Sequence, residues 1–407
     1  MSSRQGLMLK PRMAFVVLGI CFALSMLGRS ANEIFPVFLL PISAEFGWDR
    51  AEVVSIYSLA ALSAGLASPL VGRLFDLLGP RAVYAFGLLL VGGGFSAAAY
   101  AQALWQLQLC VGLAAGFGAA CLGTVASSLL LGRWFGPRLP MAMAVVFAAT
   151  GIGTLIGLPL SQVLIDAYGW RGAYRLIGVV MLGLAVPLLV LPWRRLAAGA
   201  SGAIAAPSDQ AGAEWKLSSA MCHHAFWALF STYFFTGVGM YCIAAQVVAY
   251  LVEAGFPPLQ AATAWGFSGV ALAAGMVSVS LLDGLLGRRR AILFAYGLSV
   301  TGIIMLWLLR AYPSIWLLAG FIICFGSTIG SRGPLISATA MTIFRGERVG
   351  TIFGAISLGS GLGAAFGSWS GGLIHDWTGN YDLMIVFALV NLLLGMMPFL
   401  VVPSLRQ

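Results

Sequence analysis

Two arginines lie within apolar stretches of the sequence, one in each half of the chain. Arg29 closely follows the apolar run 13–27, and Arg332 lies inside CFGSTIGSRGPLISATA, residues 324–340. A charge at the centre of a bilayer costs at least ~2.5–3.5 kcal/mol by insertion scales, so such residues by default serve a partner or a ligand. A guanidinium stays charged and offers planar donors that match a carboxylate. The two arginines therefore predict a site for a small anion between the halves.

Other polar residues on the same predicted helices extend this site. Glu33 lies four residues after Arg29, which is the spacing of an ion pair on one helix face. An anion that displaces Glu33 from Arg29 would free the carboxylate to take up a proton, and Glu33 is thus a candidate proton-coupling residue. A fixed structural pair near the outer surface is the alternative. Tyr241 and Gln246 could donate hydrogen bonds to the anion, although both types also join helices.

The composition predicts an all-α membrane protein. Hydrophobic residues make up 60% of the 407 residues and charged residues only 9%. Soluble domains average roughly 25% charged residues, so this chain has too few charged residues for the surface of a soluble protein. Several apolar runs approach the ~20 residues that span a bilayer as a helix. A transmembrane barrel would instead alternate polar and apolar residues, which this sequence does not do.

The basic residues predict the orientation in the membrane. The net charge of +9 does not point to nucleic acid, because of the 22 Lys and Arg residues sixteen fall in loops on one predicted side and four on the other. Positively charged loops stay in the cytoplasm. We therefore expect a multi-pass protein of the cell inner membrane with both termini cytoplasmic, the lipid bilayer as its surroundings, and an uncleaved first span.

Twelve helical spans can be placed on the sequence. They cover 13–40, 51–75, 82–101, 104–132, 139–165, 172–192, 220–251, 259–284, 290–310, 314–341, 348–373 and 381–402. Residues 194–216 are small and polar, as in a flexible linker. The sequence thus predicts an N-terminal six-helix bundle at 1–193, a cytoplasmic linker at 194–216 and a C-terminal six-helix bundle at 217–407.

The two predicted bundles repeat one another. LFDLLGPR at 74–81 is echoed by LLDGLLGRRR at 281–290, which aligns Asp76 with Asp283 at an offset of 207 residues. Asp166 aligns with Asp376 at an offset of 210. Internal repeats of this kind indicate two like bundles with a binding site between them near the midplane. At an offset of 208, Thr124 aligns with Arg332 and becomes a candidate for the opposite wall.

The segment GRLFDLLGPR at 72–81 resembles the signature between the second and third helices of the Major Facilitator Superfamily. This resemblance covers the whole chain and implies two six-helix pseudo-symmetric bundles whose first, fourth, seventh and tenth helices line a central cavity. It places both Arg29 and Arg332 on that cavity. It also implies a gating cluster of charges at the cytoplasmic ends, which would comprise Gly72, Arg73, Asp76, Arg81, Asp283 and Arg288.

Three segments resemble the monocarboxylate and oxalate/formate carriers within that superfamily, namely PISAEFGWDRAEV at 41–53, LLGRWFGPRLPMAMAVVFAATGIG at 130–153 and VVAYLVEAGFPPLQAA at 247–262. The resemblance implies a secondary transporter, not an enzyme, that carries a small organic anion by alternating access. The preferred substrate is a monocarboxylate, and the preferred mode of transport is symport with protons. No cofactor, metal or nucleic acid is expected, and we expect a monomer.

Three other functions stay open at this point. Anion exchange fits the oxalate/formate resemblance equally. Proton-driven drug efflux is suggested by TGIGTLIGLPL at 150–160, but it predicts a cavity of acids and aromatic residues instead of two arginines. A non-transporting sensor would need an appended domain, for which a linker of this length is too short.

Overall fold

The computed structural model describes residues 2–197, 217–344 and 349–402. Every regular element in this described part is helical, as predicted. The N-terminal half contains α1 (Ser2–Glu33), α2 (Phe35–Phe46), α3 (Arg50–Ala98), α4 (Leu104–Leu107), η1 (Gln108–Ala115), α5 (Gly116–Leu122), α6 (Thr124–Phe135), η2 (Gly136–Arg138), α7 (Leu139–Val190) and α8 (Trp193–Ala197). The C-terminal half contains α9 (Leu217–Met221), α10 (His224–Ala244), α11 (Val247–Glu253), α12 (Pro258–Leu286), α13 (Arg288–Ala311), α14 (Ile315–Phe321), η3 (Ile322–Gly326), α15 (Arg332–Ile343), α16 (Val349–Thr378) and α17 (Asp382–Val401). The predicted linker from residue 198 onward lies outside the described residues.

The twelve predicted spans are present. Nine helices in the described ranges are long and apolar enough to cross a membrane. Two of them, α3 with 49 residues and α7 with 52, are each about 75 Å of helix, more than twice the ~30 Å hydrocarbon core. Each contains two spans, since the backbone turns at Gly79 in α3 and at Gly169 in α7. The tenth span, built from α14, η3 and α15, completes the set.

The repeat seen in the sequence is also a repeat of backbone turns. Gly79 has φ 78° and Gly287 has φ 83°, and these two residues are 208 positions apart. A positive φ strains any residue with a Cβ atom, so glycine is the residue that allows these tight turns between neighbouring spans. The two halves thus break their chains at equivalent places, as pseudo-symmetric bundles should.

Several spans are interrupted within their length instead of running straight. The first span breaks between Glu33 and Phe35, where Pro36 begins α2 without a backbone donor. The tenth breaks over residues 327–331. Pro334 has no backbone N–H to donate to the Gly330 carbonyl, which instead accepts a hydrogen bond from the Gly333 N–H at 3.1 Å. Broken helices at membrane depth are tolerated where they line a cavity.

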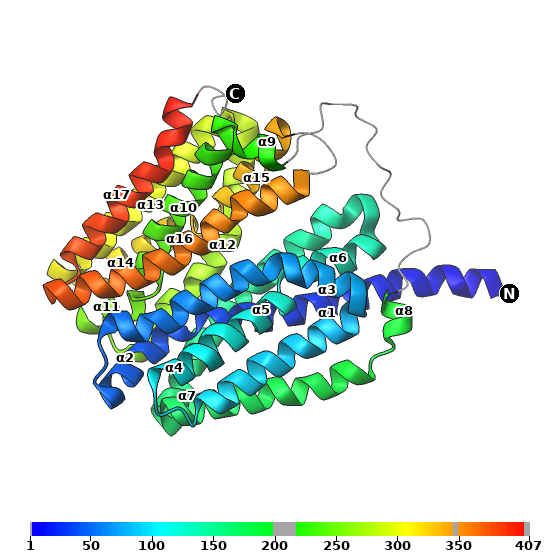
Figure 1. Ribbon diagram of the computed structural model, residues 1–407, viewed down its shortest axis with the longest axis horizontal. Helices are drawn as coiled ribbons and strands as arrows, with labels where there is room; N and C mark the ends of the chain where they lie inside the picture. The colour runs from blue at the N-terminus through cyan, green and yellow to red at the C-terminus, as the bar shows by residue number, and fades with distance from the viewer. Residues whose placement is uncertain (1, 198–216, 345–348, 403–407) are drawn as a thin grey trace.

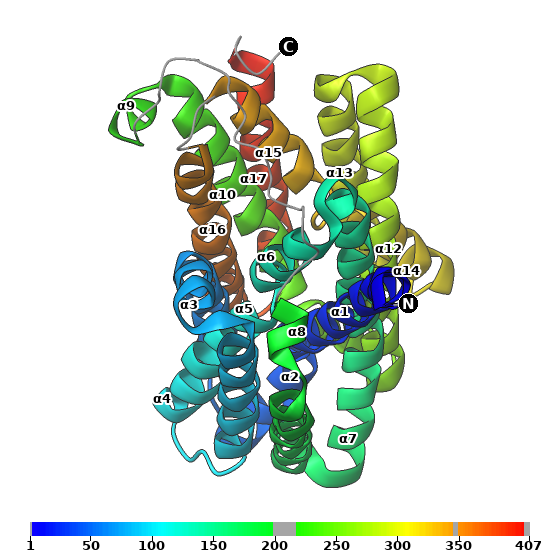
Figure 2. The ribbon, with the colours of Figure 1, turned by 90° about the vertical axis from the view of Figure 1, so that its right-hand side faces the viewer.

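The two halves converge at one end and separate at the other (Figure 1). We call them the closed end, which carries the turns at 47–49 and 379–381, and the open end, which carries the turns at Gly79 and Gly287, the start of α1 and the end of α17. On one flank α3 packs against α16 and on the other α7 packs against α12 (Figure 2). Small residues permit this approach, and a Cβ atom placed on Gly65 would lie 3.4 Å from the Gly361 Cα.

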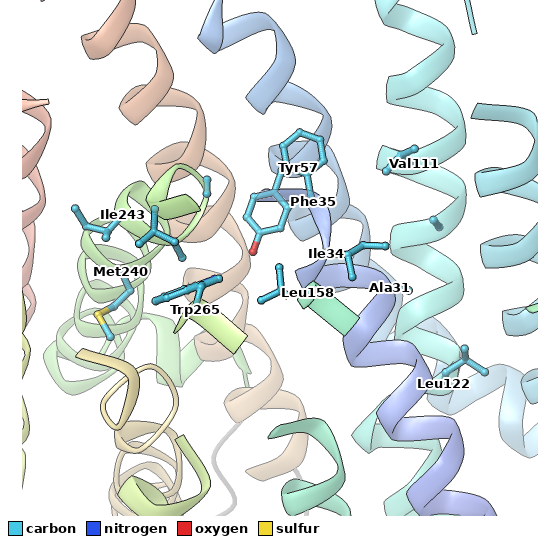
Figure 3. Packing of buried hydrophobic residues seen from close by; sticks show 14 of the residues in the cluster. Ala31, Ile34, Phe35, Tyr57, Val111, Leu122, Leu158, Met240, Ile243 and Trp265 are labelled. Atoms are coloured by element: carbon cyan, nitrogen blue, oxygen red, sulfur yellow. The ribbon is translucent and has the colours of Figure 1, made fainter. Parts of the chain in front are cut away.

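Apolar side chains fill the space between the halves towards the closed end (Figure 3). Ala31, Ile34 and Phe35 of the N-terminal half face Met240, Ile243 and Trp265 of the C-terminal half across Tyr57 and Leu158. Burial of this apolar surface contributes roughly 25 cal/mol per Å². These packed side chains close the region between the halves on the closed-end side of the cavity.

Candidate functional site

A cavity of about 400 Å³ lies between the two halves and is lined by residues of both. Arg29 and Arg332 are the charged residues that line it in the described part of the chain. Its other polar residues come from both halves and carry hydroxyls, apart from the amide of Asn32. They are Ser25, Asn32, Ser68, Thr124, Thr150, Tyr233, Thr236, Tyr241, Thr328 and Ser360. The cavity is therefore positively charged and rich in hydrogen-bonding groups, as an anion site would be.

Arg29 is the more accessible of the two arginines. It lies in the last two turns of α1, and its side chain is 28% exposed to the cavity. Its Nη2 forms an ion pair with Glu33 Oε1 at 2.9 Å, while the Glu33 side chain is only 8% exposed. The pair lies within the first span and not at its end, because the twelve residues of α2 continue the span beyond it.

Arg332 is the first residue of α15 and is held from one side by α13. Its Nη2 donates to the Ala295 carbonyl at 2.9 Å and to Ser299 Oγ, and its guanidinium lies 4.1 Å from the centre of the Tyr296 ring. Arg332 is 3% exposed, and its Nε and Nη1 have no acceptor within the described ranges. Two donor atoms are therefore available to a ligand, whereas Nη2 is already engaged.

Two of the three other predicted ligands line the cavity, and one does not. Tyr241 of α10 and Thr124 of α6 are on the cavity wall. Gln246 follows the break after α10, is fully buried and is absent from the cavity lining. The placement of Gln246 on the cavity was wrong.

Two aromatic residues beside the Arg29–Glu33 ion pair, Tyr57 and Trp265, were not predicted from the sequence. The rings of Tyr57 and Tyr241 are 6.3 Å apart, and both hydroxyls interact electrostatically with Arg29 and Glu33. Trp265 of α12 is 1% exposed and lines a smaller chamber together with Arg29 and Glu33. The repeat offset of 208 relates Tyr57 to Trp265 and Glu33 to Tyr241. Applying that offset to every polar residue pairs Tyr57 with Trp265, and this pairing is the signal in the sequence that points to them.

The predicted gating cluster lies at the open end, where the halves are apart. Arg73, Asp76 and Arg81 are exposed. Asp283 pairs with Arg288 at 3.9 Å within the C-terminal half, and Arg288 donates to Thr339 at 3.5 Å. Among the described residues, no ion pair joins this cluster to the other half. In this conformation the cluster does not hold the halves together.

A hydrogen-bonded network joins the halves at the closed end, and the sequence did not reveal it. The Asp376 carboxylate accepts from the backbone N–H groups of Arg50 and Ala51, at 3.0 and 2.7 Å, and so caps the first turn of α3 from the opposite half. The Arg50 side chain donates to Tyr381 at 3.0 Å and pairs with Glu253. Burial raises the pKa of the Tyr381 hydroxyl, which therefore stays protonated and donates to Glu253 at 3.3 Å.

The geometry defines a class of protein: a twelve-span membrane protein whose two repeated halves enclose a cavity lined by residues of both. Residues 18–368 match the model of the Major Facilitator Superfamily. The chain belongs to this superfamily, and it is a membrane transporter, not an enzyme.

Individual relatives align over most of the chain. The MFS-type transporter YcxA of Bacillus subtilis (strain 168) is 25% identical over 400 residues, which cover 96% of both chains. Monocarboxylate transporter 13 of Rattus norvegicus is 27% identical over 89% of this chain and 82% of its own. Monocarboxylate transporter 3 of Rattus norvegicus is 28% identical over 92% of this chain and 76% of its own.

Proposed function

We propose that this protein carries a small organic anion, a monocarboxylate, across the cell inner membrane by alternating access. The observation that carries the proposal is the charge of the central cavity. Arg29 and Arg332 contribute two positive charges, and Glu33 removes one through its pair with Arg29. One net positive charge matches one monoanion. The relatives named as monocarboxylate transporters support the same substrate class.

The open end is assigned to the cytoplasm, because the basic loops of the sequence gather there and positive loops stay inside. The conformation is then inward-open, with the Arg50–Asp376 network closing the outer end. When the closed end opens and the open end closes, the same two arginines would be exposed to the outside. The division at 1–193, 194–216 and 217–407 belongs to this proposal, since the two bundles must move against each other.

Uptake by purified protein in liposomes tests the substrate class directly. Monocarboxylates should accumulate when the pH is lower outside than inside, and dicarboxylates of similar size should compete at least tenfold less well. Each unmatched charge in a low-dielectric site costs several kcal/mol, which supports this preference. Equal competition by both classes would contradict the monoanion proposal. Anion exchange that is indifferent to the pH gradient would favour the exchanger alternative.

Proton coupling is assigned to Glu33, and Glu33→Gln is its test. Glutamine keeps the size and hydrogen bonding of the side chain but cannot exchange a proton. We expect this variant to retain anion exchange and to lose accumulation driven by a pH gradient. Asp166→Asn is the matched control, because the Asp166 carboxylate accepts a hydrogen bond from Gln162, at 2.8 Å, within its own helix. Unchanged pH-driven accumulation in Glu33→Gln would remove Glu33 from the mechanism.

A further inference from the structure

A second, much smaller chamber lies behind Arg29 on the side of the closed end. Its volume is about 10 Å³, and Arg29, Glu33, Thr154, Tyr241, Trp265 and Ser268 supply its polar lining. Arg29 and Tyr241 also line the main cavity, so they form part of the partition between the two spaces. The walls come from both halves. The chamber must therefore change shape when the halves move.

Trp265 lines this chamber and has an unused hydrogen-bond donor. Its ring is fixed by stacking on Phe321, with centroids 6.1 Å apart, and by contact with Phe325 at 6.3 Å. The side chain is 1% exposed, and nothing in the described part of the chain accepts a hydrogen bond from its Nε1–H. A buried donor without an acceptor is unfavourable and uncommon in native proteins. The stacking holds the donor in place despite this cost.

The repeat shows why this position matters. Trp265 is equivalent to Tyr57, and Tyr241 is equivalent to Glu33, each at an offset of 208 residues. The chamber thus lies where equivalent positions of the two halves face one another, close to the axis about which they exchange roles. Glu33 and Trp265 are on opposite walls of the chamber. Opening of the closed end would widen the chamber between these walls, and an anion held by Arg29 would then have space to enter it beside Trp265.

We propose that Trp265 is a ligand of the transported anion in the outward-open conformation only, where its Nε1–H donates to the carboxylate held by Arg29. In the present conformation the chamber has room for no more than about one water molecule. The carboxylate therefore reaches Trp265 only after the closed end has opened. This proposal rests on the proposed anion transport, and it makes Trp265 a specificity-determining residue for one side of the membrane.

The test is Trp265→Phe, which keeps an aromatic ring and removes the N–H donor. Uptake of a monocarboxylate is measured with the full-length protein in vesicles of each orientation. The KM for anion offered at the closed end should rise roughly tenfold or more, as for the loss of one hydrogen bond to a charged group. The KM for anion offered at the open end should change less than twofold. Trp316→Phe, at a position 82% exposed, is the matched control.

Equal KM changes on both sides, or none on either, would overturn the proposal for Trp265. A wild-type protein that carries no anion would instead overturn the proposed function, so the two failures are distinguishable. Thermal unfolding shows whether Trp265→Phe is folded. As a second measurement, the indole N–H resonance of Trp265, assigned by its disappearance in Trp265→Phe, should shift when anion is added to protein held outward-open. No shift in that state would count against the proposal even if the variant were unstable.

Discussion

Replacing Arg29 by alanine should lower anion uptake roughly 10- to 150-fold. The side chain is the more exposed of the two cavity arginines, and a hydrogen bond from a charged donor contributes ~1.5–3 kcal/mol, or roughly 10- to 150-fold in binding. The variant also leaves Glu33 buried without its cation, which adds a stability cost of about 3–5 kcal/mol. Initial uptake rates in liposomes, normalised to folded protein, measure the effect.

The double variant Arg29→Ala/Glu33→Gln separates binding from folding. It removes both charges of the pair, so no buried carboxylate is left unpaired, and thermal stability should return towards that of the wild type. Uptake should stay reduced to the same degree as in Arg29→Ala, because the anion still lacks its cation. Normal uptake in the folded double variant would contradict the assignment of Arg29. Arg310→Ala is the control, since Arg310 pairs with Asp382 at a half-exposed site outside the cavity.

Arg332→Ala should reduce uptake to a similar degree, for a partly different reason. The guanidinium has two donor atoms available to the anion, and it also holds α15 against Ala295 and Ser299 of α13. Arg332→Lys keeps the charge but cannot reproduce this planar set of contacts. We therefore expect the lysine variant to stay folded and to transport with a KM raised about tenfold.

Replacing Asp376 by alanine should shift the protein towards the conformation that opens at the closed end. Asp376 accepts two backbone hydrogen bonds across the halves, at 3.0 and 2.7 Å, and its charge is favourably placed at the first turn of α3. Hydrogen bonds to a charged group contribute ~1.5–3 kcal/mol each, so the equilibrium should move at least tenfold. The remaining contacts of Arg50 with Tyr381 and Glu253 limit the shift.

Spin labels at positions 77 and 285 measure this shift. Leu77 and Leu285 are 70% and 80% exposed, lie at the open end in opposite halves and are equivalent at an offset of 208. The short-distance population should increase in Asp376→Ala as the open end closes. Asp382→Ala is the control, because Asp382 bonds Trp307 and Arg310 within its own half. An unchanged distance distribution in Asp376→Ala would show that this network does not hold the closed end.

The repeat alone could not have identified the Asp376 contact. Asp166 and Asp376 are equivalent in the sequence, yet only Asp376 bonds across the halves in the described structure. The reason lies in the partners. Asp376 caps a helix that begins at Arg50, whereas the equivalent helix begins at Pro258, which has no backbone N–H to donate. Two similar carboxylates thus have different contacts because of one proline in the other half.

The sequence by itself determined the membrane class, the twelve spans, the repeat and the two arginines, because apolar run length, periodic similarity and the cost of buried charge are local properties of the chain. Only the tertiary structure decided which polar groups meet. It placed Arg29 in the cavity with Glu33 behind it, held Arg332 against α13, turned Gln246 away and left the Trp265 donor in a separate chamber. Such contacts depend on where broken helices end and how two bundles lean together, and residue spacing along one helix does not contain that information.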